Sequence, residues 1–230
     1  MSSLIDVYCD FDGTITVYDT IDVLLEKLAD PSWQDIEERW VNGEIGSREC
    51  MALQVPLIRG GWPAVAEVLQ DVKIDRTFVN FAKFCRANGV PLRIVSDGMD
   101  RVIHTVLKRE GIHVDNVIAN HLYEDEDGTL RLSFPYAPQK LACGSGVCKC
   151  LVLERGPERP IKAVIGDGRS DFCWAQEADM LFAKNKLLKH CRESKINCVP
   201  YEDFNNIKRV MESVLAEKPS SVAQLQPYFA

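Results

Sequence analysis

Apolar residues recur along the chain in two spacings, one typical of buried strands and the other of helices. Short apolar runs predict strands at residues 4–9, 91–96, 116–119, 161–165, 180–183 and 197–199. Between these runs, apolar residues three and four positions apart predict helices at 78–85, 99–110, 170–178, 186–194 and 202–215. Strands that alternate with helices are typical of a doubly wound parallel sheet. We therefore expect an α/β fold with a Rossmann-like sheet and a β-hairpin around Asp127-Gly128.

The segment between the first two predicted strands shows only the helical spacing. It predicts helices at 21–28, 33–40, 47–58 and 63–69, with breaks at Asn42-Gly43 and Gly60-Gly61. We expect a small all-helical module at residues 16–75, inserted into a core formed by residues 1–15 and 76–216. Residues 217–230 are rich in Pro, Ser and Gln and are expected to form a loosely held tail.

Composition narrows the expected partners. The formal net charge of −7 disfavours nonspecific binding to nucleic acid or to a membrane surface, because both need basic patches. The first residues do not resemble a secretion signal, and no apolar stretch is long enough to span a bilayer. We therefore expect a cytoplasmic monomer or homodimer whose 9 cysteines are reduced.

Two carboxylates directly follow the first predicted strand, in the run Asp10 to Thr14. Side chains two residues apart on a strand point the same way, so Asp10 and Asp12 can reach one volume at the strand's carboxyl end. Open α/β sheets bind ligands at that end, and two acids beside Gly13 and a hydroxyl suit attack on phosphorus next to a metal ion. The same residue types also occur in turns and calcium loops, although the residues after Gly13 lack the ligand spacing of an EF-hand.

A second polar segment, Ser96-Asp97-Gly98, ends another predicted strand. The hydroxyl of Ser96 and the free amides of the next two residues would form a phosphate site at a helix N-terminus. The alternative is that Ser96 or Asp97 only caps that helix.

Two further segments complete the set of candidate residues. Asp167 and Asp171 follow a predicted buried strand, and their carboxylates are suited to bind Mg²⁺ there. The alternative is structural, with a turn at Asp167 and Asp171 as an acidic residue in the first turn of the next helix. Lys149 lies in a cysteine-rich stretch before a helix and is able to neutralise a phosphate. A single lysine is usually a solvated surface residue, so this assignment depends on the other segments.

These four segments, in this order, resemble the four motifs of the haloacid dehalogenase-like hydrolases. The helical module at 16–75 resembles the cap domain of that superfamily. Within it, the chain is similar to the phosphoserine-phosphatase-like branch, and most of all to the 2-hydroxy-3-keto-5-methylthiopentenyl-1-phosphate phosphatases. The latter resemblance rests on the opening motif with Asp19, the cysteine-rich stretch, and the segment from Phe182 to Phe204.

The resemblance implies a Mg²⁺-dependent phosphatase acting on a small-molecule phosphate ester through an aspartyl-phosphate. Asp10 would be the nucleophile and Asp12 the general acid and base. The other residues that it implies are Ser96 and Lys149 in catalysis, Gly13, Thr14, Asp19, Asp97 and Gly98 in substrate or phosphate binding, and Asp10, Asp12, Asp167 and Asp171 around the metal ion.

The chain also departs from the family pattern. Asp19 lies where phosphoserine phosphatases carry a glutamate, and Gln54 lies near their arginine position, which disfavours phosphoserine. Asp19 is equally well interpreted as the N-cap of the helix that follows. Asp97 replaces a more common glycine and is expected to contact the substrate or pair with Arg101.

Three cysteines lie close together in the sequence, at positions 143, 148 and 150. A structural metal site would need a fourth ligand such as His121, and the alternative is a buried or substrate-facing loop. For the chain as a whole, the alternatives to this phosphatase are a phosphoserine phosphatase, a phosphotransferase or phosphomutase, and a binding protein that kept the fold.

Overall fold

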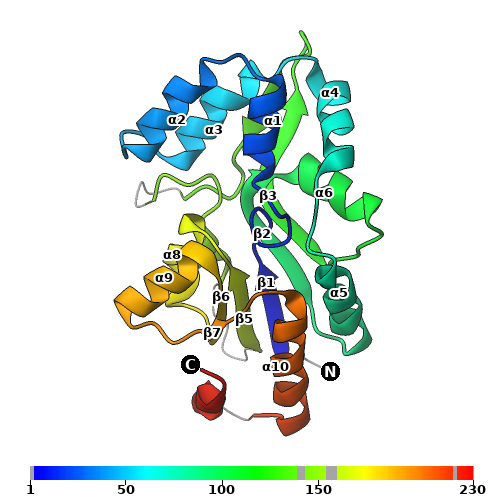
Figure 1. The fold of residues 1–230 in the computed structure, drawn as a ribbon, viewed down its shortest axis with the longest axis vertical. Helices are drawn as coiled ribbons and strands as arrows, with labels where there is room; N and C mark the ends of the chain where they lie inside the picture. The colour runs from blue at the N-terminus through cyan, green and yellow to red at the C-terminus, as the bar shows by residue number, and fades with distance from the viewer. Residues whose placement is uncertain (1–2, 139–142, 154–159, 220–221, 230) are drawn as a thin grey trace.

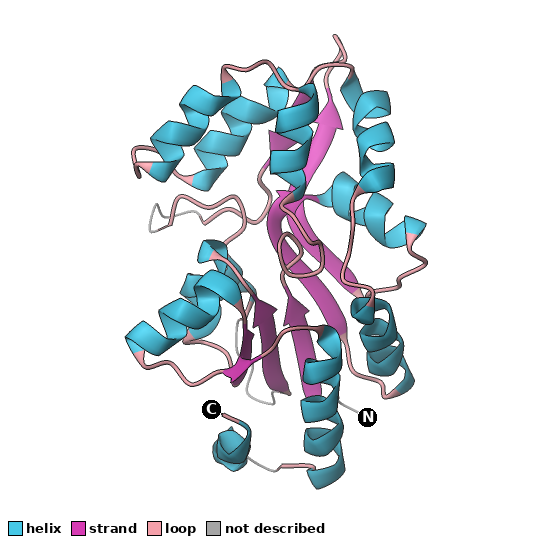
Figure 2. Ribbon diagram, in the orientation of Figure 1, coloured by secondary structure: helices cyan, strands magenta, loops and turns pink. Residues whose placement is uncertain are grey.

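The computed structural model describes residues 3–138, 143–153, 160–219 and 222–229, and its strands form one seven-stranded sheet (Figure 2). The strands are β1 (Ile5–Cys9), β2 (Leu92–Met99), β3 (Asn116–Glu124), β4 (Leu130–Ser133), β5 (Ile161–Gly166), β6 (Met180–Ala183) and β7 (Val199–Pro200). Their order is β4-β3-β2-β1-β5-β6-β7. All neighbours are parallel except β3 and β4, which form the predicted hairpin. The predicted α/β fold is confirmed.

β1 lies in the middle of the sheet, and its residues alternate between two apolar cores. Ile5, Val7 and Cys9 belong to the core on one face, whereas Tyr8 belongs to the core on the other. The neighbouring β5 is buried along its whole length, as expected for a strand covered on both faces. Residues that follow β1 therefore lie at the centre of the sheet's carboxyl edge.

Helices cover both faces of the sheet (Figure 1). α5 (Thr77–Ala87), α6 (Asp100–Arg109) and α10 (Phe204–Glu217) contribute side chains to the core that contains Val7. α8 (Phe172–Ala175) and α9 (Asn185–Ser194) contribute to the core on the opposite face. Among the described residues, no helix is both long and apolar enough to cross a bilayer.

Residues 16–75 are helical, as predicted. They form α1 (Thr20–Leu28), α2 (Trp33–Val41), α3 (Ser47–Gln54) and α4 (Gly61–Val68), with short 3₁₀ turns at Val55–Leu57 and Leu69–Asp71. Figure 1 shows these helices beyond the carboxyl ends of β1 and β2. A β-bridge between Thr16 and Ile74 brings the two connections to the sheet side by side. The division of the chain into core and inserted module stays a prediction.

Two predicted strands are longer than expected, and the tail differs from the prediction. β2 continues through Ser96 to Met99, where its pairing with β3 resumes after a register shift, because polar residues in a bulged strand interrupt the apolar pattern. β3 runs to Glu124 for a similar reason. In the described part of the tail, Leu225 is fully buried in the core that contains Val7. An isolated leucine carries no periodic signal, so the sequence pattern did not reveal this contact.

Candidate active site

The carboxyl ends of β1, β2 and β5 bring the candidate segments together. Asp10 directly follows β1, Ser96 lies within β2, and Asp167 directly follows β5. Lys149 is the first residue of the short helix α7 (Lys149–Val152) and reaches the same edge. Polar side chains after buried strands thus meet at one place, as the sequence predicts.

Lys149 is almost completely enclosed by the protein, with 1 % of its surface exposed. Its Nζ lies 2.8 Å from Asp10 Oδ1 and 2.7 Å from Asp171 Oδ1, and it donates to Ser170 Oγ at 3.1 Å. Burial acts to lower the pKa of Lys149, but the Asp10 and Asp171 carboxylates outweigh it and raise that pKa. Lys149 is therefore a permanent positive charge beside Asp10.

Asp10 is nearly buried and is held from two sides. Its Oδ1 accepts a hydrogen bond from the Phe11 amide at 2.8 Å and the ion pair from Lys149. Burial raises the pKa of Asp10 well above its ordinary value, and the charge of Asp171 raises it further, against the effect of Lys149. One lysine does not offset all the carboxylates of this site, so a further cation would stabilise the ionised form of Asp10.

An acidic group at this edge fits such a cation. One carboxylate oxygen each of Asp10, Asp167 and Asp171 lie within 4.8 Å of one another. Thr14 Oγ1 donates to Asp167 at 2.9 Å, and Asn185 Nδ2 donates at 3.2 Å, which fixes that side chain. Burial raises the pKa of Asp167. Carboxylate oxygens are hard ligands of the kind that Mg²⁺ prefers.

Asp171 differs from the other two aspartates because its oxygens are already engaged. Oδ2 accepts the amides of Asp167 and Gly168, both at 3.0 Å, while Oδ1 is paired with Lys149. A Cβ atom at Gly166 would lie 2.5 Å from the Asp171 carboxylate, so only glycine fits there. This arrangement lets Asp171 orient Lys149 and shape the loop after β5.

Asp12 is the second acid of the opening motif and has its own set of donors. The Thr20 amide and hydroxyl donate to Oδ1 at 2.8 and 2.6 Å, and Ser96 Oγ donates to Oδ2 at 3.4 Å. Burial raises the pKa of Asp12, and the two bonds from Thr20 act against this shift. A carboxyl group with a raised pKa is suited to give and take a proton near neutral pH.

Glycines at two positions let these groups approach closely. Gly13 has φ +70°, and a Cβ there would lie 2.8 Å from Asp167 Oδ2. A Cβ at Gly98 would lie 2.6 Å from Asp12 Oδ2. The Gly98 amide donates to Ser96 Oγ at 2.9 Å. The predicted helix N-terminus at Ser96 is wrong, because these residues belong to β2 and α6 begins only at Asp100.

Asp19 lies beside Asp12 at the start of α1. Its side chain accepts the Ile21 amide at 2.9 Å, which confirms the N-cap interpretation. Desolvation by the surrounding protein raises the pKa of Asp19, and the charges of Asp12 and Asp22 raise it further. A capping role does not prevent a contact with substrate, which stays a prediction.

Two residues expected near the substrate have other partners. Gln54 is buried and donates to Glu37 Oε2 at 2.9 Å and to the Trp33 carbonyl at 3.4 Å, so it joins α2 to α3. Arg101 pairs with Glu124 at 3.3 Å and does not pair with Asp97. Asp97 instead contacts Ser47, Asn120 and Val147.

The cysteine-rich stretch places Cys148 Sγ 3.8 Å from Cys143 Sγ and 3.2 Å from Cys150 Sγ. His121 is paired with Asp100 at 2.8 Å and does not join them. Within the described part of the chain, the three aspartates are the group that could hold a metal ion, and these cysteines do not form a second one.

Thr20 and Asn185 contact the candidate residues Asp12 and Asp167, and sequence reasoning missed both. Thr20 gave no signal, because its contact with Asp12 joins the start of α1 to the turn after β1. Asn185 has a left-handed backbone, φ +49°, which is uncommon for a residue other than glycine. Asn185 also lies just after the buried strand β6, as Asp10 and Asp167 lie just after β1 and β5. This position in the sequence could have marked it as a candidate site residue.

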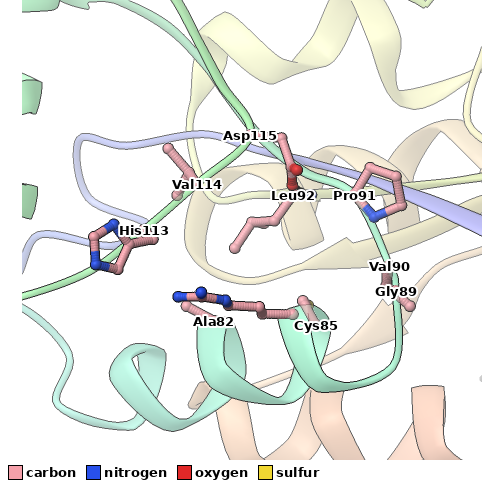
Figure 3. A pocket seen from close by; sticks show the side chains of 10 residues that line it. Ala82, Cys85, Gly89, Val90, Pro91, Leu92, His113, Val114 and Asp115 are labelled. Atoms are coloured by element: carbon pink, nitrogen blue, oxygen red, sulfur yellow. Dashed lines mark hydrogen bonds between the residues drawn. The ribbon is translucent and has the colours of Figure 1, made fainter.

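A separate cavity of about 280 Å³ lies at the other end of the sheet (Figure 3). Its walls include Cys85, Leu92, His113 and Asp115, near the amino ends of β2 and β3. None of the candidate catalytic residues lines it. The cavity is therefore distinct from the site at the carboxyl edge.

Comparison with known proteins agrees with this geometry. The family model for haloacid dehalogenase-like hydrolase matches residues 7–176. A Bacillus velezensis protein named 2-hydroxy-3-keto-5-methylthiopentenyl-1-phosphate phosphatase is 30% identical over 213 residues, which cover 90% of this chain and 90% of that protein. A protein of the same name from an Exiguobacterium species is 30% identical over 214 residues, covering 90% and 97%.

Solved structures support the fold. A phospho-aspartyl intermediate analogue of phosphoserine phosphatase has a TM-score of 0.66 and 18% sequence identity, and the match covers 91% of this chain and 99% of that one. An apo phosphoserine phosphatase has a TM-score of 0.64 and 20% identity, covering 90% and 98%. At these identities the likeness establishes the fold alone.

Proposed function

The chain belongs to the haloacid dehalogenase-like hydrolases and is a phosphatase, and we propose that it hydrolyses a small phosphorylated metabolite through an aspartyl-phosphate on Asp10. One observation carries this proposal. The buried ammonium of Lys149 lies 2.8 Å from Asp10, and a second acid, Asp12, is held separately by Thr20. A nucleophile beside a fixed cation and an independent proton donor are the two requirements of covalent phosphoryl transfer.

In the first step, an Asp10 carboxylate oxygen attacks phosphorus, and the bond from phosphorus to the ester oxygen breaks. Asp12 gives its proton to the departing alcohol. In the second step, water attacks the phosphorus of the aspartyl-phosphate, and the Asp12 carboxylate takes the proton of that water. Inorganic phosphate leaves, and the Asp10 carboxylate is restored.

The remaining groups stabilise charge on the phosphoryl oxygens. We assign this role to Lys149, the Ser96 hydroxyl and the Gly98 amide, with Gly13 and Thr14 shaping the turn around them. Asp10, the backbone carbonyl of Asp12 and Asp167 would hold Mg²⁺, with Asp171 supporting the site. When bound, Mg²⁺ would screen the repulsion between the carboxylates and the substrate phosphate.

Residues 16–75 would act as a cap that closes over the site, excludes water and selects the substrate. At the start of α1, Thr20 donates to Asp12, and the neighbouring Asp19 feels the charge of Asp12. The names of the curated relatives favour 2-hydroxy-3-keto-5-methylthiopentenyl-1-phosphate as the substrate. Phosphoserine is the weaker candidate, because Gln54 is engaged inside the cap with Glu37. We expect a cytoplasmic monomer or homodimer.

Phosphate release from a panel of phosphorylated metabolites tests the proposal. The panel contains both named substrates, and each reaction is run with Mg²⁺ or with EDTA, both without and with an added acceptor alcohol. We expect free phosphate that depends on Mg²⁺, with the highest kcat/KM for the methylthiopentenyl substrate. A preference for phosphoserine would overturn the proposed substrate assignment. Phosphate that appears only on an added acceptor would indicate a phosphotransferase.

A further inference from the structure

Asp97 joins three separate parts of the molecule through one carboxylate. Ser47 Oγ, at the start of α3, donates to Oδ2 at 2.5 Å. The Val147 amide, in the loop that leads to Lys149, donates to Oδ1 at 2.9 Å. Asp97 itself lies in β2, next to Ser96. The helical segment 16–75, the loop at residues 143–148 (here called the lysine loop) and the sheet therefore all contact this side chain.

The surroundings of Asp97 fix its orientation. Asn120 is fully buried in β3, and its Nδ2 donates to the Asp97 carbonyl at 2.5 Å and lies 3.4 Å from Oδ1. A Cβ at Gly146 would lie 2.4 Å from Asn120 Oδ1 and 2.8 Å from Asp97 Oδ1. Since both carboxylate oxygens have donors and the Gly146 backbone packs closely against Asp97, the Asp97 side chain has little freedom to turn toward a substrate.

A second contact lies beside the first and joins the same two segments. A Cβ at Gly46 would lie 2.4 Å from the Gly144 carbonyl oxygen, so the two backbones touch. The Arg48 amide donates to that carbonyl at 2.9 Å. In Figure 1 the yellow-green loop that includes residues 143–148 passes below α2 and α3. The start of α3 thus rests directly on the loop that carries Lys149.

We propose that Asp97 is a positioning residue that couples the docking of α3 to the placement of Lys149, a role that rests on the function proposed above. In this structure α3 lies against the loop that precedes Lys149, and Ser47 Oγ is 2.5 Å from Asp97 Oδ2. The same carboxylate holds Val147, two residues before Lys149, and Asp97 adjoins Ser96, which contacts Asp12. Closure of the helical segment therefore orders the groups that bind the phosphoryl oxygens.

Four variants test the coupling: Ser47→Ala, Ser47→Thr, Asp97→Ala and the double alanine variant. Loss of one hydrogen bond to a charged acceptor corresponds to about tenfold, so Ser47→Ala should lower kcat by about tenfold and change KM less. Asp97→Ala should lower kcat further, because Val147 also loses its acceptor. The double variant should be no worse than Asp97→Ala, since both changes remove one bridge. Ser47→Thr keeps the hydroxyl and should keep most of the activity.

Ser32→Ala is the matched control. Ser32 donates its hydroxyl to Asp30 at 2.8 Å within the helical segment, so it is also a serine–aspartate pair, but it does not reach the sheet. Amide hydrogen exchange should speed up in α3 and in residues 143–149 for Ser47→Ala and Asp97→Ala, and stay unchanged in both regions for Ser32→Ala.

Two results would overturn the coupling. In the first, Ser47→Ala keeps wild-type kcat and exchange while Asp97→Ala raises KM, which would make Asp97 a substrate contact. In the second, the single effects multiply in the double variant. If Asp97→Ala does not fold, Ser47→Ala and Ser47→Thr still decide the matter. If the wild-type protein releases no phosphate, the proposed function fails, and the exchange measurements still test the bridge.

Discussion

The carboxyl edge of the sheet and the helical segment 16–75 contribute to the site in different ways. At the edge of the sheet, Asp10, Lys149 and Asp171 are all at most 4 % exposed, and both aspartates pair with Lys149. The helical segment reaches the site through polar contacts, two from Thr20 to Asp12 and one from Ser47 to Asp97. The proposed catalytic groups thus lie mainly at the edge of the sheet, and we expect the helical segment to adjust their chemistry.

Packing shows the same contrast. β5 is buried at every position, whereas α2 contains no buried residue. A buried charge network tolerates little change, because removal of one partner leaves another charge unpaired. Residues on a lightly packed helix allow substitutions that alter substrate selection and leave the reaction intact. Substitutions should therefore have large effects at the sheet and graded effects in the helical segment.

The strongest test of the sheet side is Asp10→Asn. An amide is a poor nucleophile, so kcat should fall by at least about a thousandfold while the fold is retained. Phosphate release and circular dichroism measure the two quantities. Asp6→Asn is the matched control, since Asp6 lies in β1, the strand that Asp10 follows, and pairs with Arg93 outside the site. Near-wild-type turnover in Asp10→Asn would refute the nucleophile assignment.

Lys149→Met should affect both activity and stability. Two buried carboxylates, Asp10 and Asp171, would lose their common partner, and we expect a loss of about 3–5 kcal/mol in the free energy of unfolding. kcat should fall about a hundredfold or more, because a charge that stabilises the transferring phosphoryl group is removed. Urea unfolding and steady-state kinetics measure these effects. Lys189→Met, at an exposed lysine, is the control, and wild-type kcat in Lys149→Met would contradict the assignment.

The sheet side was also the part that the sequence predicted well. Asp10 and Asp167 each follow an apolar run that ends abruptly, so a local pattern reported both the strand and the polar group after it. The doubly wound parallel arrangement of the sheet followed from the alternation of strands with helices and from the chirality of parallel crossovers. Lys149 carried no such signal by itself, and the resemblance to a known family supplied its place.

The contacts between the helical segment and the sheet were not predictable in this way. Thr20 meets Asp12, and Ser47 meets Asp97 across 50 residues of sequence, through hydrogen bonds that no periodicity records. The length of β2 was underestimated because a register shift carries it through Ser96 to Met99. Local patterns report local structure, whereas these features depend on how distant segments pack.

Thr20→Val tests whether the helical segment adjusts the chemistry. The substitution removes one hydroxyl donor from Asp12 and keeps the backbone donor. kcat should fall about tenfold. Burial raises the pKa of Asp12 and the Thr20 bonds lower it, so loss of the hydroxyl raises that pKa further. The protonated acid then persists to higher pH, and the carboxylate base forms only at higher pH.

Both limbs of the pH–rate profile should therefore move to higher pH in Thr20→Val. Rates measured from about pH 5 to 9 check the direction of this shift. Thr105→Val is the control, because the Thr105 hydroxyl bonds within α6 to the Arg101 carbonyl. An unchanged profile with a lower kcat would mean that Thr20 positions Asp12 without affecting its proton affinity.

Gln54→Ala should have the smallest effect on activity. The side chain is buried between α2 and α3, where it donates to Glu37 and to the Trp33 carbonyl. Its loss should lower the free energy of unfolding by about 1–3 kcal/mol and change kcat/KM by less than about threefold. Gln70→Ala, at an exposed glutamine that bonds only to the Ala66 carbonyl, should change neither quantity. If Gln54→Ala instead raised KM tenfold at unchanged stability, Gln54 would face the substrate. The helical segment would then contribute a substrate contact at this position, in addition to the polar pairs within it.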